Sequence, residues 1–220
     1  GAEREFKRAI ELNQNFSSAY LWYWQLQNLL ERHDESLKAI QRALELAPMN
    51  SFIAANFYWR LYYLRRYDEA IAGITKLTEI YPQYWLVYWT RGALFGAKAM
   101  YKEAVADQQK AVSLSEGSLE CLPDLGWAYA KSGNRAQAMK LLAVLNEESK
   151  KRYVPAIYRV LIHLGLNEMD LAFAALEKAF QEHDMRLAWS LTDPSFAPFR
   201  TDARAQSLLR RMNLPLGELK

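Results

Sequence analysis

The side chains that could do chemistry in this chain include three histidines. A zinc site needs His, Cys or carboxylate ligands at short, regular spacings, as in the H-E-x-x-H motif on one face of a helix. His33, His163 and His183 stand far apart in the sequence and match no such spacing. We therefore expect these histidines at the surface or at helix ends, and we expect no bound metal ion.

Nucleophilic chemistry and phosphate binding have no motif either. Cys121 is the single cysteine, and it falls at the expected start of a helix, where the helix dipole can lower a thiol pKa. No histidine base accompanies it, so we interpret it as a partly buried structural residue. The acid pairs Asp68-Glu69 and Glu147-Glu148 are typical of helix starts and solvated faces. Because G-x-S-x-G and glycine-rich phosphate loops are also absent, we expect neither an enzyme nor a bound cofactor.

The composition is that of a folded helical protein with little charge bias. Of 220 residues, 51% are hydrophobic and 24% are charged, and the net charge is +3. This balance predicts no nucleic-acid partner. Nine Gly and seven Pro are few for a β-rich fold. Since no apolar run reaches the length of a membrane span, we expect no membrane insertion and a cytoplasmic chain, or an extracytoplasmic one if a parent protein is membrane-anchored.

A small residue recurs every 34 positions and indicates an internal repeat. A mostly apolar residue follows four positions later and another three positions after that, so that all three lie on one face of a helix. Pro48 and Pro82 end this helix in two of the units, because proline cannot continue the hydrogen-bond ladder. The small residues of the successive units are Ala2, Ser36, Ala70, Ala104, Ala138 and Ala172.

Each unit also has a first helix with its own pattern. In "LPDLGWAYAKSGNRAQA", Leu122, Leu125, Gly126 and Tyr129 lie along one face, and Gly133 turns the chain into the next helix. The position of Gly126 is taken by Gly92, Tyr58 and Trp24 in the three preceding units.

With these two helices per 34 residues, the chain resembles tetratricopeptide repeats over residues 2–182 or so. The resemblance implies an all-α fold: a right-handed superhelical solenoid with a concave inner surface and a C-terminal helical cap. The array would cover residues 1–184, with a half repeat at 1–16 and a capping segment at 185–220. Because the first helix has no preceding partner helix, we infer that the chain is part of a longer protein. Full repeats are expected at about 17–50, 51–84, 85–118, 119–150 and 151–184.

In tetratricopeptide domains the first helix of each unit lines the concave groove. Carried over to this sequence, that placement implies an aromatic groove, because tryptophans recur on successive inner helices. Tyr and Trp are favoured binding residues, since they bury a large area at low entropy cost. The alternative is that these rings only fill space between helices. The groove residues implied are Trp22, Gln25, Asn56, Trp59, Tyr62, Tyr63, Trp89, Trp127, Lys131 and Arg159.

The groove composition also argues against one class of peptide. Tetratricopeptide domains that hold acidic C-terminal peptides use a set of Lys, Arg and Asn residues. Here only Asn56, Lys131 and Arg159 could contribute, and they are far apart in the array. We expect no strong binding of such peptides.

The end of the chain resembles the end of tetratricopeptide regions in bacterial multidomain signalling proteins. There the repeats follow a winged-helix, protein-kinase or adenylate-cyclase module, and the matching pieces are "LEKAFQEHD", "DPSFAPFR" and "LLRRMNLP". Ala203 and Ala205 depart from that pattern, which usually has Pro and an aromatic residue, and should weaken docking of the last helix.

We expect this last helix to begin after Thr201 or Asp202 as its cap. Leu208, Leu209 and Met212 would form its apolar side, and Asn213 and Pro215 would close it.

The function implied is a non-catalytic scaffold that binds a peptide or partner segment in the groove, as a regulatory part of a larger bacterial signalling or transcription protein. Two alternatives stay open. The solenoid could self-associate into a homo-oligomer through the open face of residues 2–12, or the groove could sense a small ligand.

Overall fold

The computed structural model describes residues 1–200, 202–212 and 214. These residues form helices and connecting turns, and no strand occurs among them. The first helix, α1 (Ala2–Leu12), stands alone, and five helix pairs follow it. The pairs are α2 (Ser17–Leu29) with α3 (His33–Leu46), α4 (Ser51–Tyr63) with α5 (Tyr67–Ile80), α6 (Trp85–Ala97) with α7 (Tyr101–Leu114), α8 (Leu122–Lys131) with α9 (Arg135–Ser149), and α10 (Ile157–Gly165) with α11 (Met169–Gln181).

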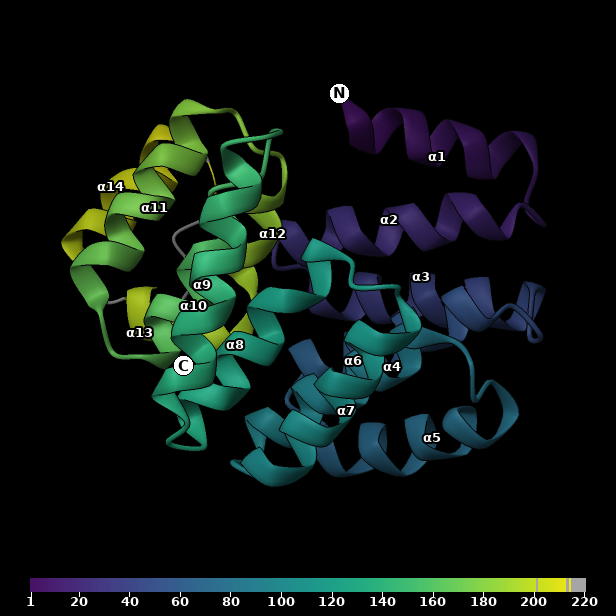
Figure 1. The fold of residues 1–220 in the computed structure, drawn as a ribbon. Coiled ribbons are helices and arrows are strands. Elements are labelled where there is room, and N and C mark those ends of the chain that lie inside the picture. Colours follow the sequence, from purple (N-terminus) through teal and green to yellow (C-terminus); the bar gives the residue numbers. More distant parts are fainter. Residues whose placement is uncertain (201, 213, 215–220) are drawn as a thin grey trace.

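The pairs stack in chain order into a curved array (Figure 1). Within each pair the two helices pack against each other, and the first helices of successive pairs also meet, as α4 with α6, α6 with α8 and α8 with α10. We call α2, α4, α6, α8 and α10 the inner helices. A short 3-10 helix, η1 (Leu119–Cys121), precedes α8. The arrangement is the all-α solenoid expected from the 34-residue period.

The periodic small residues bring the helices of a pair together. Ser36, Ala70, Ala104, Ala138 and Ala172 each have at most 1% of their surface exposed. Their volume sets how closely two helices approach. Buried polar groups at the interface find backbone partners: the Ser36 hydroxyl donates to the Trp24 carbonyl (2.9 Å), and the Gln108 amide donates to the Trp89 carbonyl (3.0 Å). Ala2, by contrast, is exposed, because α1 packs mainly on α2 and has no preceding repeat against it.

The turn inside each pair repeats its backbone conformation every 34 residues. Glu31, Arg65, Ala99, Gly133 and Asn167 all have φ between 58° and 85°. This left-handed conformation suits glycine and is tolerated by asparagine, but it is strained for other residues by about 1 kcal/mol or more. The chain therefore contains three strained turns and two relaxed ones at equivalent places.

Replacing Ala99 with glycine should raise the free energy of unfolding by about 1 kcal/mol, because the strain at φ 58° disappears. Gly133→Ala, at the equivalent turn, should lower it by a similar amount. Urea unfolding of both variants measures the two changes. Destabilisation by Ala99→Gly would contradict the assigned turn conformation.

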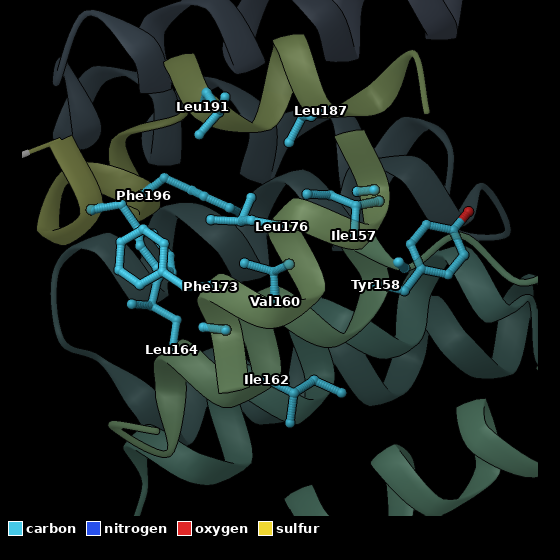
Figure 2. Close-up of a cluster of buried hydrophobic side chains, with 14 of the residues drawn as sticks. Ile157, Tyr158, Val160, Ile162, Leu164, Phe173, Leu176, Leu187, Leu191 and Phe196 are labelled. Atoms are coloured by element: carbon cyan, nitrogen blue, oxygen red, sulfur yellow. The ribbon is translucent and has the colours of Figure 1, made fainter. Parts of the chain in front are cut away.

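The segment after α11 packs against two different parts of the array. Its helices are α12 (Arg186–Thr192), η2 (Pro194–Phe196), α13 (Ala197–Arg200) and α14 (Ala203–Arg211). The last of these packs on α11, whereas α12 lies against α2, about 160 residues earlier in the chain (Figure 1). Figure 2 shows Leu187 and Leu191 pointing from α12 into the C-terminal hydrophobic cluster, toward Leu176 and Phe196. The segment is thus a cap that also reaches back across the array.

The final helix docks through leucines and arginines. Leu208 and Leu209 are buried, and Asp202 caps the helix by accepting a hydrogen bond from the Arg204 backbone N–H (2.9 Å). Arg204 also bonds Asp170 on α11 (2.8 Å), and its guanidinium lies 3.8 Å from the Phe173 ring centre. These contacts hold α14 on α11. The weaker docking expected from Ala203 and Ala205 stays a prediction. The expected roles of Thr201, Asn213 and Pro215 fall outside the described residues.

Candidate binding site

A cavity of about 600 Å³ lies between the inner helices and the segment 186–196. We call it the central cavity. Its walls come from α4, α6, α8 and α10 on one side and from α12 and η2 on the other. Cavities of this size are typical of small-molecule sites. Its aromatic lining residues are Trp59, Tyr62, Tyr63, Tyr67, Trp89, Tyr101, Trp127, Tyr158, Trp189 and Phe196.

Stacked rings form one wall of the central cavity. Trp59 lies between Tyr62, at a centroid distance of 4.7 Å and an interplanar angle of 13°, and Trp89, at 4.5 Å and 28°. Near the other end, Trp127 meets Tyr101 edge-on at 6.0 Å. Such contacts contribute about 0.5–1.5 kcal/mol each beyond the area that they bury. The wall is therefore a rigid row of rings carried by neighbouring repeats.

The backbone approaches this wall closely at Gly96. A Cβ atom added there would lie 2.6 Å from the Trp127 ring, so that any larger residue must push the indole aside. The glycine on α6 thereby fixes the position of the Trp127 ring in the cavity lining.

A carboxyl group, that of Asp124 on α8, lines the same cavity. Its Oδ2 accepts a hydrogen bond from the indole Nε1–H of Trp89 (2.9 Å). The pKa of Asp124 is raised to about 7, chiefly by burial and also by the nearby acids Asp193 and Glu120, although the Trp89 hydrogen bond opposes the shift. The group therefore titrates near neutral pH.

Asp193 joins the segment 186–196 to the inner wall. One carboxylate oxygen accepts hydrogen bonds from the Tyr62 hydroxyl (2.9 Å), from the Ser195 backbone N–H (2.8 Å) and from the Ser195 hydroxyl (2.6 Å). Burial raises the pKa of Tyr62 well above its ordinary value, so its hydroxyl stays a donor. This contact spans 131 positions of the chain.

The structure brings six of the predicted groove residues together. Trp59, Tyr62, Tyr63, Trp89, Trp127 and Lys131 all line the central cavity.

The other four predicted residues lie elsewhere. Trp22 is 46% exposed and meets Phe52 on the next inner helix at 6.3 Å, and Gln25 is partly buried on α2. The Asn56 amide donates to its own helix, at the Phe52 carbonyl (2.9 Å). Arg159 turns toward α9, where it bonds Asn146 (2.7 Å) and the Leu145 carbonyl.

Sequence reasoning missed the residues that enter the cavity from other elements. Tyr67 and Tyr101 begin α5 and α7, one period apart, so the 34-residue spacing could have identified them. Trp189, Asp193 and Phe196 belong to the end segment. The Asp193-Pro194 pair predicted a break, but no local pattern indicates that this break faces Tyr62.

The groups considered for catalysis occupy structural places. Cys121 is fully buried, and burial raises the pKa of its thiol to about 11, which leaves it protonated and weakly nucleophilic. His163 pairs with Glu168 (2.8 Å). Over the described ranges, no group of three or more His, Cys, Asp or Glu side chains could hold a metal ion. None of the helices in the described part has the length and apolar character needed to cross a bilayer.

The pKa of Asp124 predicts a pH-dependent stability. Because its folded-state pKa of about 7 exceeds that of the unfolded chain, the folded state holds a proton that the unfolded state loses first. The stability from this group is therefore complete below pH 4 and is lost as pH rises toward 7. Asp124→Asn should be more stable than the parent at pH 8 by about 2–4 kcal/mol and should match it near pH 4. Urea unfolding of both proteins across this range measures the difference, and a constant difference would contradict the prediction.

The comparisons with known proteins agree with this architecture. No model of a known protein family matches the chain. A DnaJ homolog subfamily C member 7 homolog of Dictyostelium discoideum is 31% identical over 137 residues, which are 60% of this chain and 25% of that protein. The chain thus spans about a quarter of the length of this curated relative.

Two solved structures share the fold. Yeast Tom70 superposes with a TM-score of 0.60 and 18% identity over 96% of this chain and 46% of that chain. MamA from Desulfovibrio magneticus RS-1 does so with a TM-score of 0.53 and 14% identity over 69% of this chain and 86% of that chain. Both are tetratricopeptide-repeat proteins. The chain therefore has the fold of an all-α, right-handed tetratricopeptide solenoid with a C-terminal helical cap.

Proposed function

We propose that the chain is a non-catalytic scaffold that binds a partner segment on its concave side. The observation that carries the proposal is the exposed aromatic surface on the inner helices. Trp22 and Phe52 are 46% and 36% exposed, lie on neighbouring inner helices, and contact each other. We call these two residues the aromatic rim. Exposed Trp and Phe on one face are a common anchor for protein partners.

The aromatic rim suits a partner because its two rings are part-exposed and do not line the central cavity. The segment 186–196 lines one side of the central cavity, whereas the rim residues lie outside that lining and can be reached without moving the segment. A side chain of the partner can then pack between the two exposed rings at little entropy cost.

Alanine substitution tests this surface with little risk to the fold. Immobilised chain, incubated with extract of the cells that make it, should retain a partner that Trp22→Ala and Phe52→Ala release. Tyr153→Ala is the matched control, because Tyr153 is 63% exposed but lies in the loop before α10. Equal retention by all variants would contradict the proposal.

The proposal excludes one ligand class that some repeat proteins bind. Of the polar residues that could hold an acidic C-terminal peptide, Asn56 and Arg159 are engaged within the fold. The cavity lining that contains Lys131 also contains the acids Asp124 and Asp193. A fluorescein-labelled acidic C-terminal peptide should show no saturation up to about 100 μM, since like charges disfavour it. Submicromolar binding in an anisotropy titration would contradict this expectation.

Ligand sensing is the second candidate, and the central cavity favours it. The cavity is lined on both sides, has a volume of about 600 Å³, and joins the inner helices to the end segment. A ligand there would contact both walls at once and stabilise the closed arrangement by mass action.

Self-association is the third candidate. The helix α1 has no buried residue, and Leu12 at its end is 70% exposed, so this face could meet a second copy. Light scattering at several protein concentrations tests it, and a mass that stays monomeric throughout would remove it.

The proposal also includes the kind of larger protein to which the chain belongs. The end segment resembles that of bacterial multidomain signalling proteins, and we propose that the chain serves there as a regulatory, cytoplasmic part. Sequencing the full reading frame tests this setting directly.

A further inference from the structure

The central cavity combines aromatic rings with the carboxyl group of Asp124, for which the described part of the chain shows no ion pair. Asp124 takes its hydrogen bond from a neutral indole, that of Trp89 (2.9 Å). The charged groups that act on it, Asp193 and Glu120, are themselves acidic. A carboxylate in such a place lacks the counter-ion that buried charges normally have.

The basic residues of the lining do not supply that counter-ion. Arg186 pairs with Asp184 (3.5 Å) and lies over the Tyr158 ring at 5.6 Å. Lys131 lies seven positions beyond Asp124 on the same helix, which is about two turns or 10 Å along its axis. Among the described residues neither of these basic side chains pairs with Asp124, which lines the cavity, so an external cation could supply the missing charge.

The aromatic rings of the cavity are the second feature that favours an organic cation. The faces of tryptophan and tyrosine carry negative charge density and attract ammonium groups, above all alkylated ones, which lose little hydration on entry. Trp89 and Trp127 line the cavity, and Asp124 is hydrogen-bonded to the first of them. A cation held against these rings would lie beside the carboxylate.

The space available selects the size of the ligand. The segment 186–196 already occupies part of the concave side and is fixed there by the Asp193–Tyr62 hydrogen bond. The remaining volume of about 600 Å³ is within the range of small-molecule sites, about 300–1,000 Å³. An extended peptide would have to displace the segment, whereas a small molecule fits beside it.

We propose that the central cavity binds a small quaternary ammonium compound, with its alkylated nitrogen against the tryptophan rings and next to the Asp124 carboxylate. This site is separate from the aromatic rim, so it can hold a ligand whether or not a partner binds there. Occupancy would bridge the inner helices and the end segment.

Choline and its neutral isostere, 3,3-dimethylbutan-1-ol, test the proposal as a matched pair, because a positively charged nitrogen in choline is replaced by an uncharged carbon in the alcohol. Isothermal titration calorimetry of the whole chain should give saturable choline binding, at least about ten-fold tighter than that of the alcohol. Equal affinities would overturn the proposal, and so would the absence of saturable choline binding.

Two substitutions that should change the choline affinity in opposite directions distinguish a charge effect from a packing effect. Asp124→Asn, which keeps the shape, should weaken choline binding about ten-fold, and Lys131→Ala should strengthen it severalfold, because it removes a like charge. Asp202→Asn, at the N-cap of α14 and outside the cavity lining, should leave binding unchanged. Circular dichroism shows whether each variant is folded. If folded Asp124→Asn binds choline as tightly as the parent, the proposed carboxylate role is wrong.

Discussion

Replacement of Asp193 with alanine should lower the free energy of unfolding by about 3 kcal/mol, because its carboxylate accepts three hydrogen bonds at 2.6–2.9 Å and bonds to a charged acceptor contribute about 1.5–3 kcal/mol each. The change would also leave the Tyr62 hydroxyl buried without its acceptor. The segment 186–196 should therefore detach more readily from the inner wall. Urea unfolding measures the stability, and hydrogen exchange of amides 186–200 measures the detachment.

Asp202→Ala is the matched control. Asp202 also caps a short helix, by accepting from the Arg204 backbone N–H, but it makes no contact with the inner helices that the structure records. Loss of such a cap costs about 1 kcal/mol. A second control is Tyr62→Phe, which removes the hydroxyl while keeping the ring, and its effect should be far from additive with that of Asp193→Ala. Equal losses for Asp193→Ala and Asp202→Ala would contradict the bridging role.

The second large effect is expected at Gly126. A Cβ atom there would lie 2.6 Å from Cγ1 of Ile162, a fully buried side chain on α10. Gly126→Leu should therefore cost about 3 kcal/mol, because overpacking a dense interior forces side chains off their rotamers and shifts the backbone. Thermal or urea unfolding measures the loss.

A double substitution tests the cause of that loss. Ile162→Ala alone should cost about 2–5 kcal/mol by leaving a cavity. In the double variant the added leucine can use that space, so the two losses should fall short of their sum by about 1–2 kcal/mol. Additive losses would mean that Gly126 is required for its backbone and not for the close approach of α8 and α10.

The periodic part of the fold could be predicted from the sequence, because the 34-residue spacing of small residues reflects the close packing of two helices in every repeat. Small residues 34 positions apart set the approach of paired helices, and Ser36, Ala70 and Ala138 are all fully buried. The three strained turns could not be predicted, since Glu31, Arg65 and Ala99 are not residues that favour a positive φ. Their conformation follows from the packing of the helices on either side.

Only one wall of the central cavity could be predicted from the sequence, because only that wall is built from the repeats. Trp59, Trp89 and Trp127 repeat on inner helices, so their common face follows from the repeat. The opposite wall comes from a non-repeating segment, whose position depends on Asp193 meeting Tyr62. A contact between residues so far apart in the chain leaves no periodic signal. The raised pKa of Asp124 could not be predicted from the sequence either. It depends on burial and on the nearby Asp193, which belongs to this segment.

Site-specific cross-linking tests the central proposal, partner binding on the concave side, most directly. Benzoylphenylalanine placed at position 22, on the aromatic rim, and at position 153, in the loop before α10, would report contacts within a few ångströms after illumination in the cells that make the protein. The proposal predicts a partner adduct from position 22 and none from position 153, with the cross-linked segment identified by mass spectrometry. Adducts from position 153 alone, or equally from both positions, would contradict it.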